Sequence, residues 1–172
     1  MPELKYKRWL PGTEIEAPLR LYHCKVEPGW IDYNGHMTES SYLWAFGEAS
    51  DALFRYVGID EAYRAAGRSF YTVETHLNYY KETKNGEPLR FTTQLLGLDE
   101  KRLHLFQTMV HGLTDELAAT TEQMLAHVDM KAAAASPITP EVYTALSAIM
   151  AVHQTMPIPR QVGRQMAIRK NN

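Results

Sequence analysis

A long, almost wholly apolar helix is the feature that most constrains what this chain can fold into. Apolar residues recur at helical spacing between positions 39 and 57, at Tyr42, Phe46, Ala49, Leu53 and Val57. We expect Thr38 to cap this helix and Gly58 to end it, which gives a length of about 28 Å. Because further apolar side chains fill most of its remaining circumference, other elements must enclose the helix.

Alternating apolar and polar residues predict strands on both sides of that helix. We expect them at residues 19–26, 71–79, 89–98 and 103–110. The run Lys84-Asn85-Gly86-Glu87 predicts a hairpin turn between the second and third of these. In the second strand, the predicted apolar face consists of Tyr71, Val73, Leu77 and Tyr79.

Residues 117–130 fit either a helix or a strand. Their alanines favour a helix, whereas the alternation and the position at the end of a strand meander favour a strand, which we predict. Residues 139–154 read as a further helix with Pro140 at its first position.

This order of elements predicts an α+β fold, in which one antiparallel sheet wraps around the long central helix and a C-terminal helix follows. We divide the chain into an irregular N-terminal extension (1–18), one domain (19–155) and a basic C-terminal tail (156–172). The outer face of such a sheet is often covered by a second copy, so we expect a homodimer or homotetramer.

Composition excludes several classes of protein. A net charge of −2 over 172 residues gives no sign of a nucleic-acid or membrane partner. The single cysteine, Cys24, cannot form an internal disulfide, and we see no signal peptide or apolar run long enough to cross a bilayer. We therefore expect a cytoplasmic protein.

The segment Asp32-Tyr33-Asn34-Gly35-His36-Met37, just before the long helix, resembles the motif of hotdog-fold acyl-CoA thioesterases of the 4-hydroxybenzoyl-CoA thioesterase type. The resemblance extends over residues 22–140 and includes the turn at 84–87 and the strand at 117–129. It implies a hotdog fold, an acyl-CoA substrate and no resident cofactor or metal.

The resemblance also implies a catalytic role for Asp32, Gly35, His36 and Glu39. Thioester hydrolysis needs an attacking group and a donor for the oxyanion, while the thiol leaves without a strong acid. The backbone N–H of Glu39, at the positive end of the helix, would be the oxyanion donor. Asp32 would act as the nucleophile or as the general base for water, and the sequence leaves both open.

Other interpretations compete with this assignment. An aspartate in a turn most often serves only to hold the turn, and a lone histidine such as His36 is more often a structural hydrogen-bonding group. Some hotdog thioesterases use an acidic residue of the central helix instead, which would be Glu48 or Asp51 here, although a solvated or ion-paired face is the simpler interpretation of both.

Three stretches, at residues 35–40, 71–76 and 99–105, are similar to the betainyl-CoA thioesterases of carnitine breakdown. Their acyl group carries a quaternary ammonium, which aromatic faces and carboxylates can hold. We therefore predict Trp30, Tyr33 and Tyr42 as substrate-binding residues, although core packing is the common fate of such side chains.

The phosphates of coenzyme A require cations, and eight basic residues are candidates without a basis for choosing among them. They are Lys84, Lys101, Arg102, Lys131, Arg160, Arg164, Arg169 and Lys170.

Several rival functions are open. A hotdog dehydratase would be expected to carry an Asn-Pro pattern, which the chain lacks. A non-catalytic acyl-CoA-binding domain, a degenerate structural subunit and a thioesterase for another short or aromatic acyl-CoA are the alternatives. Turnover of any acyl-CoA would exclude the non-catalytic ones.

Overall fold

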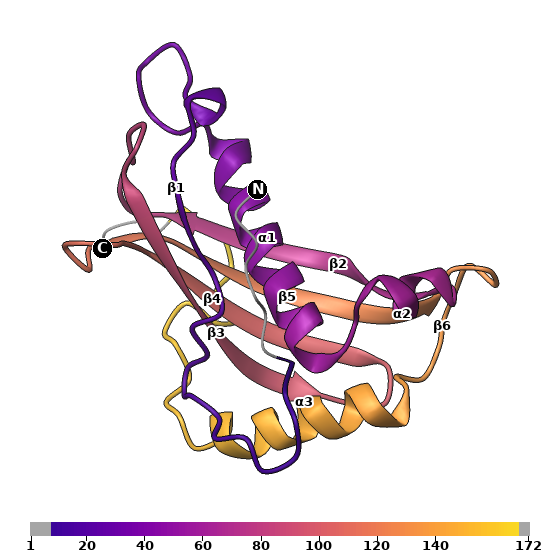
Figure 1. Ribbon diagram of the computed structural model, residues 1–172. Coiled ribbons are helices and arrows are strands. Elements are labelled where there is room, and N and C mark those ends of the chain that lie inside the picture. Colours follow the sequence, from indigo (N-terminus) through magenta and orange to yellow (C-terminus); the bar gives the residue numbers. More distant parts are fainter. Residues whose placement is uncertain (1–7, 169–172) are drawn as a thin grey trace.

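A curved antiparallel sheet lies across the long helix α1, and α3 packs at one end of that sheet (Figure 1). The computed structural model describes residues 8–168. Its elements, in chain order, are β1 (His23–Lys25), the 3-10 helix η1 (Pro28–Trp30), α1 (Glu39–Val57), α2 (Glu61–Ala65), β2 (Arg68–Tyr79), β3 (Pro88–Leu98), β4 (Arg102–His111), β5 (Leu117–Asp129), β6 (Ala134–Ala135) and α3 (Pro140–His153).

The predicted central helix is confirmed at both ends. It spans 19 residues, Thr38 is its N-cap, and Gly58 ends it with a φ of 101°. A left-handed conformation of this kind suits glycine, which has no Cβ to clash with the following carbonyl. Residues 117–130 form the strand β5, as predicted, and Pro140 begins α3.

The order of strands in the sheet is β1-β3-β4-β5-β2, with β6 beside β5. The predicted hairpin between the strands at 71–79 and 89–98 is therefore wrong, because β2 pairs with β5 and β3 pairs with β1. The turn at 84–87 exists, but it packs against the end of β1, where Gly86 N donates to Val26 O at 2.8 Å. The connection from β2 to β3 thus passes from one edge of the sheet to the strand next to the opposite edge.

The predicted apolar face of β2 is wrong in its first half. A β-bulge between Thr72 and Glu74 shifts the register against β5, and such a shift exchanges the two faces of a strand. Phe70 and Leu77 consequently both pack on the core, whereas Tyr71 and Val73 are 52% and 62% exposed. The first predicted strand is also shorter than expected, because only His23–Lys25 forms a ladder with β3.

The core between α1 and the sheet is divided by a polar layer. The Ser50 hydroxyl of α1 has three acceptors for its one proton, Phe46 O (3.1 Å) in its own helix, Gln123 Oε1 of β5 (3.2 Å) and Gln107 Oε1 of β4 (3.4 Å). Gln107 in turn donates to Thr93 of β3 at 3.3 Å. One apolar cluster, which includes Phe46, lies toward the N-terminus of α1, and the other cluster includes the buried side chains of α3.

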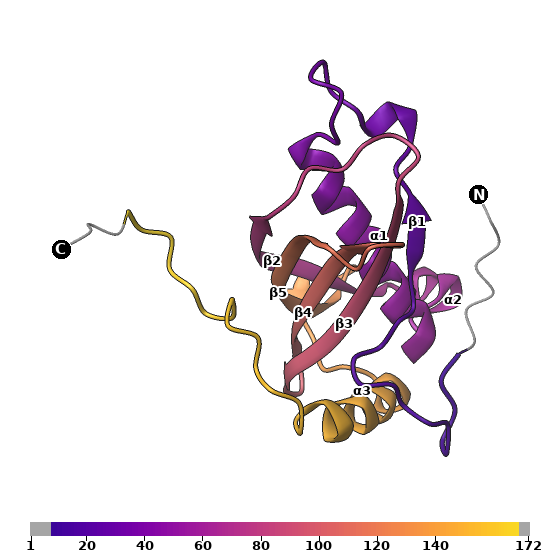
Figure 2. The same cartoon turned by 90° about the vertical axis from the view of Figure 1, so that its left-hand side faces the viewer.

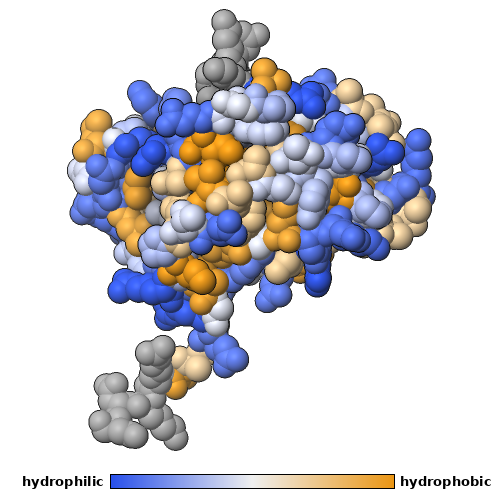
Figure 3. Space-filling model, turned by 90° about the horizontal axis from the view of Figure 1, so that it is seen from below, coloured by the Kyte–Doolittle hydropathy of each residue, from blue (hydrophilic) through white to orange (hydrophobic). Residues whose placement is uncertain are grey.

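The chain segments outside the domain that we predicted contain no helix or strand where the structure describes them, at residues 8–18 and 156–168. The C-terminal segment leaves α3, crosses the outer face of the sheet and extends away from the body (Figure 2). The end of the molecule seen from the side of α3 carries apolar side chains among hydrophilic ones, as expected for a helix that buries only one face (Figure 3). None of the helices within residues 8–168 has the length and apolar character needed to cross a membrane.

Candidate active site

A tight loop before α1 holds the predicted catalytic residues. Its two ends pair as an isolated bridge between Ile31 and Met37, and Asp32 N donates to His36 O at 2.9 Å. Gly35 turns the chain with a φ of 81°, a conformation that side chains with a Cβ rarely adopt. These contacts fix the conformation of the loop, and the loop places the Asp32 carboxylate just ahead of the helix.

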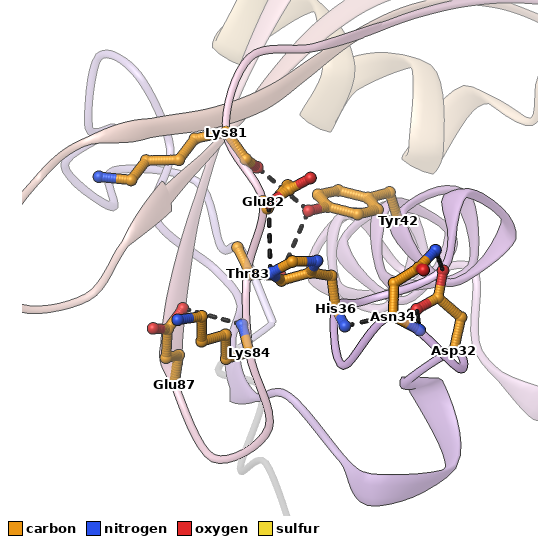
Figure 4. A network of polar contacts seen from close by, with 9 residues as sticks. All are labelled: Asp32, Asn34, His36, Tyr42, Lys81, Glu82, Thr83, Lys84 and Glu87. Atoms are coloured by element: carbon orange, nitrogen blue, oxygen red, sulfur yellow. Dashed lines mark hydrogen bonds and ion pairs between the residues drawn. The ribbon is translucent and has the colours of Figure 1, made fainter.

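One oxygen of the Asp32 carboxylate stabilises the loop by hydrogen bonds. Its Oδ1 accepts the backbone N–H of Asn34 at 2.8 Å and that of His36 at 3.4 Å (Figure 4). Its Oδ2 has only a long contact of 3.5 Å from Asn34 Nδ2. The turn-forming role and a chemical role are thus compatible, because the second oxygen of the half-buried carboxylate is left for chemistry.

The N-terminus of α1 begins where the loop ends. Thr38 occupies the N-cap position and its N–H donates to Trp30 O at 2.8 Å, but its hydroxyl hydrogen-bonds with that of Ser40 and accepts no N–H of the helix. The first N–H groups of a helix lack intrahelical acceptors and carry a partial positive charge. The predicted oxyanion donor, the N–H of Glu39, lies at this uncapped end.

His36 points away from the Asp32 carboxylate. Its Nε2 lies 3.2 Å from Glu82 Oε2, on the connection after β2 (Figure 4). The imidazole is half-buried and ties the loop to that connection. The structure therefore brings Asp32, Gly35, His36 and Glu39 into one place but does not form a dyad between Asp32 and His36.

The predicted substrate-binding aromatics lie in three different environments. Trp30 is half-buried and stacks at a tilt against Trp44 of α1, with ring centroids 5.1 Å apart. Tyr33 is 96% exposed at the tip of the loop. Tyr42 is only 4% exposed, and its hydroxyl donates to Lys81 O at 3.1 Å. In the single chain, Tyr42 thus offers almost no surface to a ligand.

The two acidic alternatives on α1 differ. Asp51 is ion-paired with Arg55 at 2.7 Å and Arg64 at 3.6 Å, which confirms the simpler interpretation of that residue. Partial burial raises the pKa of Glu48, and nearby Asp51 raises it further. Glu48 lies nine residues along α1 from Glu39, or roughly 14 Å, so it is remote from the helix end of its own chain.

The candidate cations are scattered. Lys84 lies in the turn next to the loop, and its ammonium forms no ion pair within residues 8–168. Lys101, Arg102 and Lys131 lie at the opposite end of the sheet, since Arg102 pairs with Ala126 and Lys131 follows the end of β5. Arg160 and Arg164 lie on the tail, while Arg169 and Lys170 fall outside the described residues.

Two residues of this site were missed by the sequence-based prediction, Glu82 and Thr83. They belong to the connection after β2 and contact the loop from about 46 residues away in the chain. No local pattern marks such a contact. Across the described part of the chain, no three His, Cys, Asp or Glu side chains are grouped so as to hold a metal ion.

Known proteins of similar sequence carry a consistent set of names. A family model described as the thioesterase-like superfamily matches residues 26–146. A bifunctional L-carnitine dehydrogenase/betainyl-CoA thioesterase of Rhizobium meliloti (strain 1021) is 45% identical over 158 residues, which are 91% of this chain and 32% of that protein. The chain thus spans about a third of the length of such bifunctional relatives. A betainyl-CoA thioesterase of Pseudomonas aeruginosa is 38% identical over 151 residues, which are 87% of this chain and 95% of that protein.

Solved structures agree on the fold. A Pseudomonas putida KT2440 protein provisionally assigned as a thioesterase superposes with a TM-score of 0.78 at 32% identity, covering 89% of this chain and 98% of that one. A Staphylococcus aureus protein solved in complex with CoA also gives 0.78, at 23% identity over 91% of this chain and 100% of that one. The predicted α+β hotdog fold is confirmed.

Proposed function

Because the chain belongs to the thioesterase-like superfamily, we propose that it is an acyl-CoA thioesterase that hydrolyses betainyl-CoA to betaine and free CoA. The observation that carries the reaction class is the Asp32 loop, which leads directly into the uncapped N-terminus of α1. The names of the relatives from Rhizobium meliloti and Pseudomonas aeruginosa support the choice of acyl group.

The proposed chemistry uses the two halves of this arrangement. The Asp32 carboxylate attacks the thioester carbonyl, or removes a proton from a water that attacks it. The Glu39 N–H, backed by the partial positive charge of α1, stabilises the oxyanion that forms. The oxyanion then collapses, the carbon–sulfur bond breaks, and CoA leaves as a thiolate that takes up a proton. On the nucleophilic route, water afterwards hydrolyses the acyl-aspartyl anhydride.

Aromatic rings around the loop suit a quaternary ammonium. Such a cation cannot donate a hydrogen bond, so ring faces within about 6 Å supply most of its attraction. Trp44 is 49% exposed beside Trp30, and Glu39 adds a carboxylate on the first turn of α1. We assign the acyl group to Trp30 and Trp44 with Tyr33, and we leave out Tyr42 because its side chain is buried in the single chain. We assign Lys84 to the CoA phosphates, because it is the candidate cation next to the loop.

A second copy of the chain would complete this site. Strand β2 is an edge strand of the sheet, and it exposes Tyr71 and Val73. On α1, Leu43 and Trp44 are 44% and 49% exposed. An unpaired edge flanked by apolar side chains favours pairing with another strand. We therefore propose a homodimer, or a tetramer built from it.

The test compares betainyl-CoA with 3,3-dimethylbutanoyl-CoA, in which a carbon atom replaces the ammonium nitrogen without changing the shape. We expect kcat/KM to favour betainyl-CoA by roughly 2- to 30-fold, the range of cation–π attraction. Equal kcat/KM values would leave the thioesterase assignment standing but refute betainyl-CoA as the preferred substrate. If the chain binds betainyl-CoA but releases no thiol from betainyl-CoA, acetyl-CoA or benzoyl-CoA, it is a non-catalytic binding domain.

A further inference from the structure

The connection after β2 contains one buried residue at the edge of the candidate site. Thr83 is 2% exposed, whereas its neighbours Glu82 and Lys84 are exposed. Because the connection crosses from β2 to β3 at the end of the sheet, Thr83 comes to lie against both the end of the Asp32 loop and the first turn of α1 (Figure 4).

Thr83 contacts both of these segments. Its carbonyl oxygen accepts the N–H of Met37 at 2.8 Å, which fixes the end of the loop. Its hydroxyl lies 3.3 Å from Tyr42 Oη and 3.2 Å from Met37 Sδ. A threonine hydroxyl has one proton, and a phenol oxygen is a better acceptor than a thioether sulfur. The hydroxyl of Tyr42 in turn donates to Lys81 O at 3.1 Å.

The result is a short, partly buried chain of hydrogen bonds from Thr83 through Tyr42 to the carbonyl oxygen of Lys81. A separate contact supports it, since Tyr79 Oη donates to Glu39 O at 3.1 Å. The end of β2 therefore holds the helix start at Glu39, and the connection after β2 holds it at Tyr42 and holds the loop at Met37.

We propose that Thr83 is a positioning residue for the thioester hydrolysis: it fixes the first turn of α1, and with it the Glu39 N–H, relative to the Asp32 carboxylate. This inference rests on the proposed function. Thr83 acts through Met37 and Tyr42 and does not itself touch the reacting atoms. An oxyanion donor works only within a few tenths of an ångström of its best position, so a looser helix start costs rate rather than binding.

The test replaces Thr83 by valine, which keeps the shape and removes the hydroxyl. We expect kcat for betainyl-CoA to fall by roughly 3- to 10-fold, the equivalent of one hydrogen bond, while KM stays within about twofold. Thr83→Ser restores the hydroxyl and is expected to return kcat to within about twofold of wild type.

Thr93→Val is the matched control. Thr93 is also buried, at 3% exposure, and its hydroxyl accepts a hydrogen bond from Gln107 at 3.3 Å in the middle of the sheet. It is expected to lower the melting temperature without changing kcat. The proposal is overturned if Thr83→Val keeps the wild-type kcat, if Thr83→Ser loses as much as Thr83→Val, or if both valine variants lower kcat alike. If wild type releases no thiol from any acyl-CoA, the proposed function has failed, and the positioning role fails with it.

Discussion

Replacement of Asp32 by asparagine separates the chemical role of this residue from its role in the turn. Oδ1 of Asp32 accepts two backbone N–H groups, from Asn34 at 2.8 Å and from His36 at 3.4 Å. The carbonyl oxygen of an asparagine can accept both, so the loop is expected to keep its shape. What disappears is the negative charge and the oxygen Oδ2, which would attack the thioester or accept the proton from water.

The expected effect on rate is large and the expected effect on stability is small. Loss of a general base typically lowers kcat by about 10²–10⁴-fold, which raises the barrier by about 3–5 kcal/mol. A hydrogen bond to a charged acceptor is worth about 1 kcal/mol more than one to a neutral acceptor. Because Asp32 is partly exposed, the free energy of unfolding should fall by no more than about 1 kcal/mol.

The assay follows thiol release from betainyl-CoA together with thermal unfolding by circular dichroism. Asp129→Asn is a matched control, because Asp129 Oδ1 also accepts two backbone N–H groups, from Lys131 at 2.8 Å and Ala132 at 3.1 Å, at the opposite end of the sheet. Its rate should equal that of wild type. A folded Asp32→Asn variant with more than about a tenth of the wild-type kcat would refute the reasoning. Glu48, whose pKa is raised by burial, would then be the next residue to test.

Three further predictions concern recognition, packing and pH. Trp44→Leu should lower kcat/KM for betainyl-CoA by roughly 2- to 30-fold and change that for 3,3-dimethylbutanoyl-CoA much less; equal losses would contradict a cation–π contact. Phe46→Ala should lower the free energy of unfolding by about 3–5 kcal/mol in urea, since Phe46 is 0% exposed and packs edge-on against Phe91; a loss below about 1 kcal/mol would disprove this. Burial lowers the pKa of His153, whose Nδ1 accepts the N–H of Leu95 at 2.9 Å. The neutral His153 imidazole stabilises the folded state fully above about pH 6.5, and this stabilisation is lost as the pH falls through the lower pKa of the folded state. His153→Gln should therefore reduce the drop in melting temperature between about pH 7.5 and 5. An unchanged drop would refute this prediction.

The sequence by itself determined the central helix and the loop ahead of it. The spacing of apolar residues from 39 to 57, with Thr38 before and Gly58 after, was enough to place α1 at both ends. The loop before it was predictable because Asp32 and Gly35 have local tasks, an Asx-type turn and a positive φ. Such features depend on neighbours within a few residues, so they can be read along the chain.

Only the tertiary structure decided which strands pair and what surrounds the loop. The turn at 84–87 was correctly located, yet the strands around it pair with β5 and β1. The bulge after Thr72, which turns Tyr71 and Val73 outward, leaves no mark in the alternation. Thr83 reaches Met37 and Tyr42 only because the connection crosses the sheet end. These contacts join residues about 40 or more positions apart, and their free energy depends on the packing of the whole sheet against α1, which no local pattern contains.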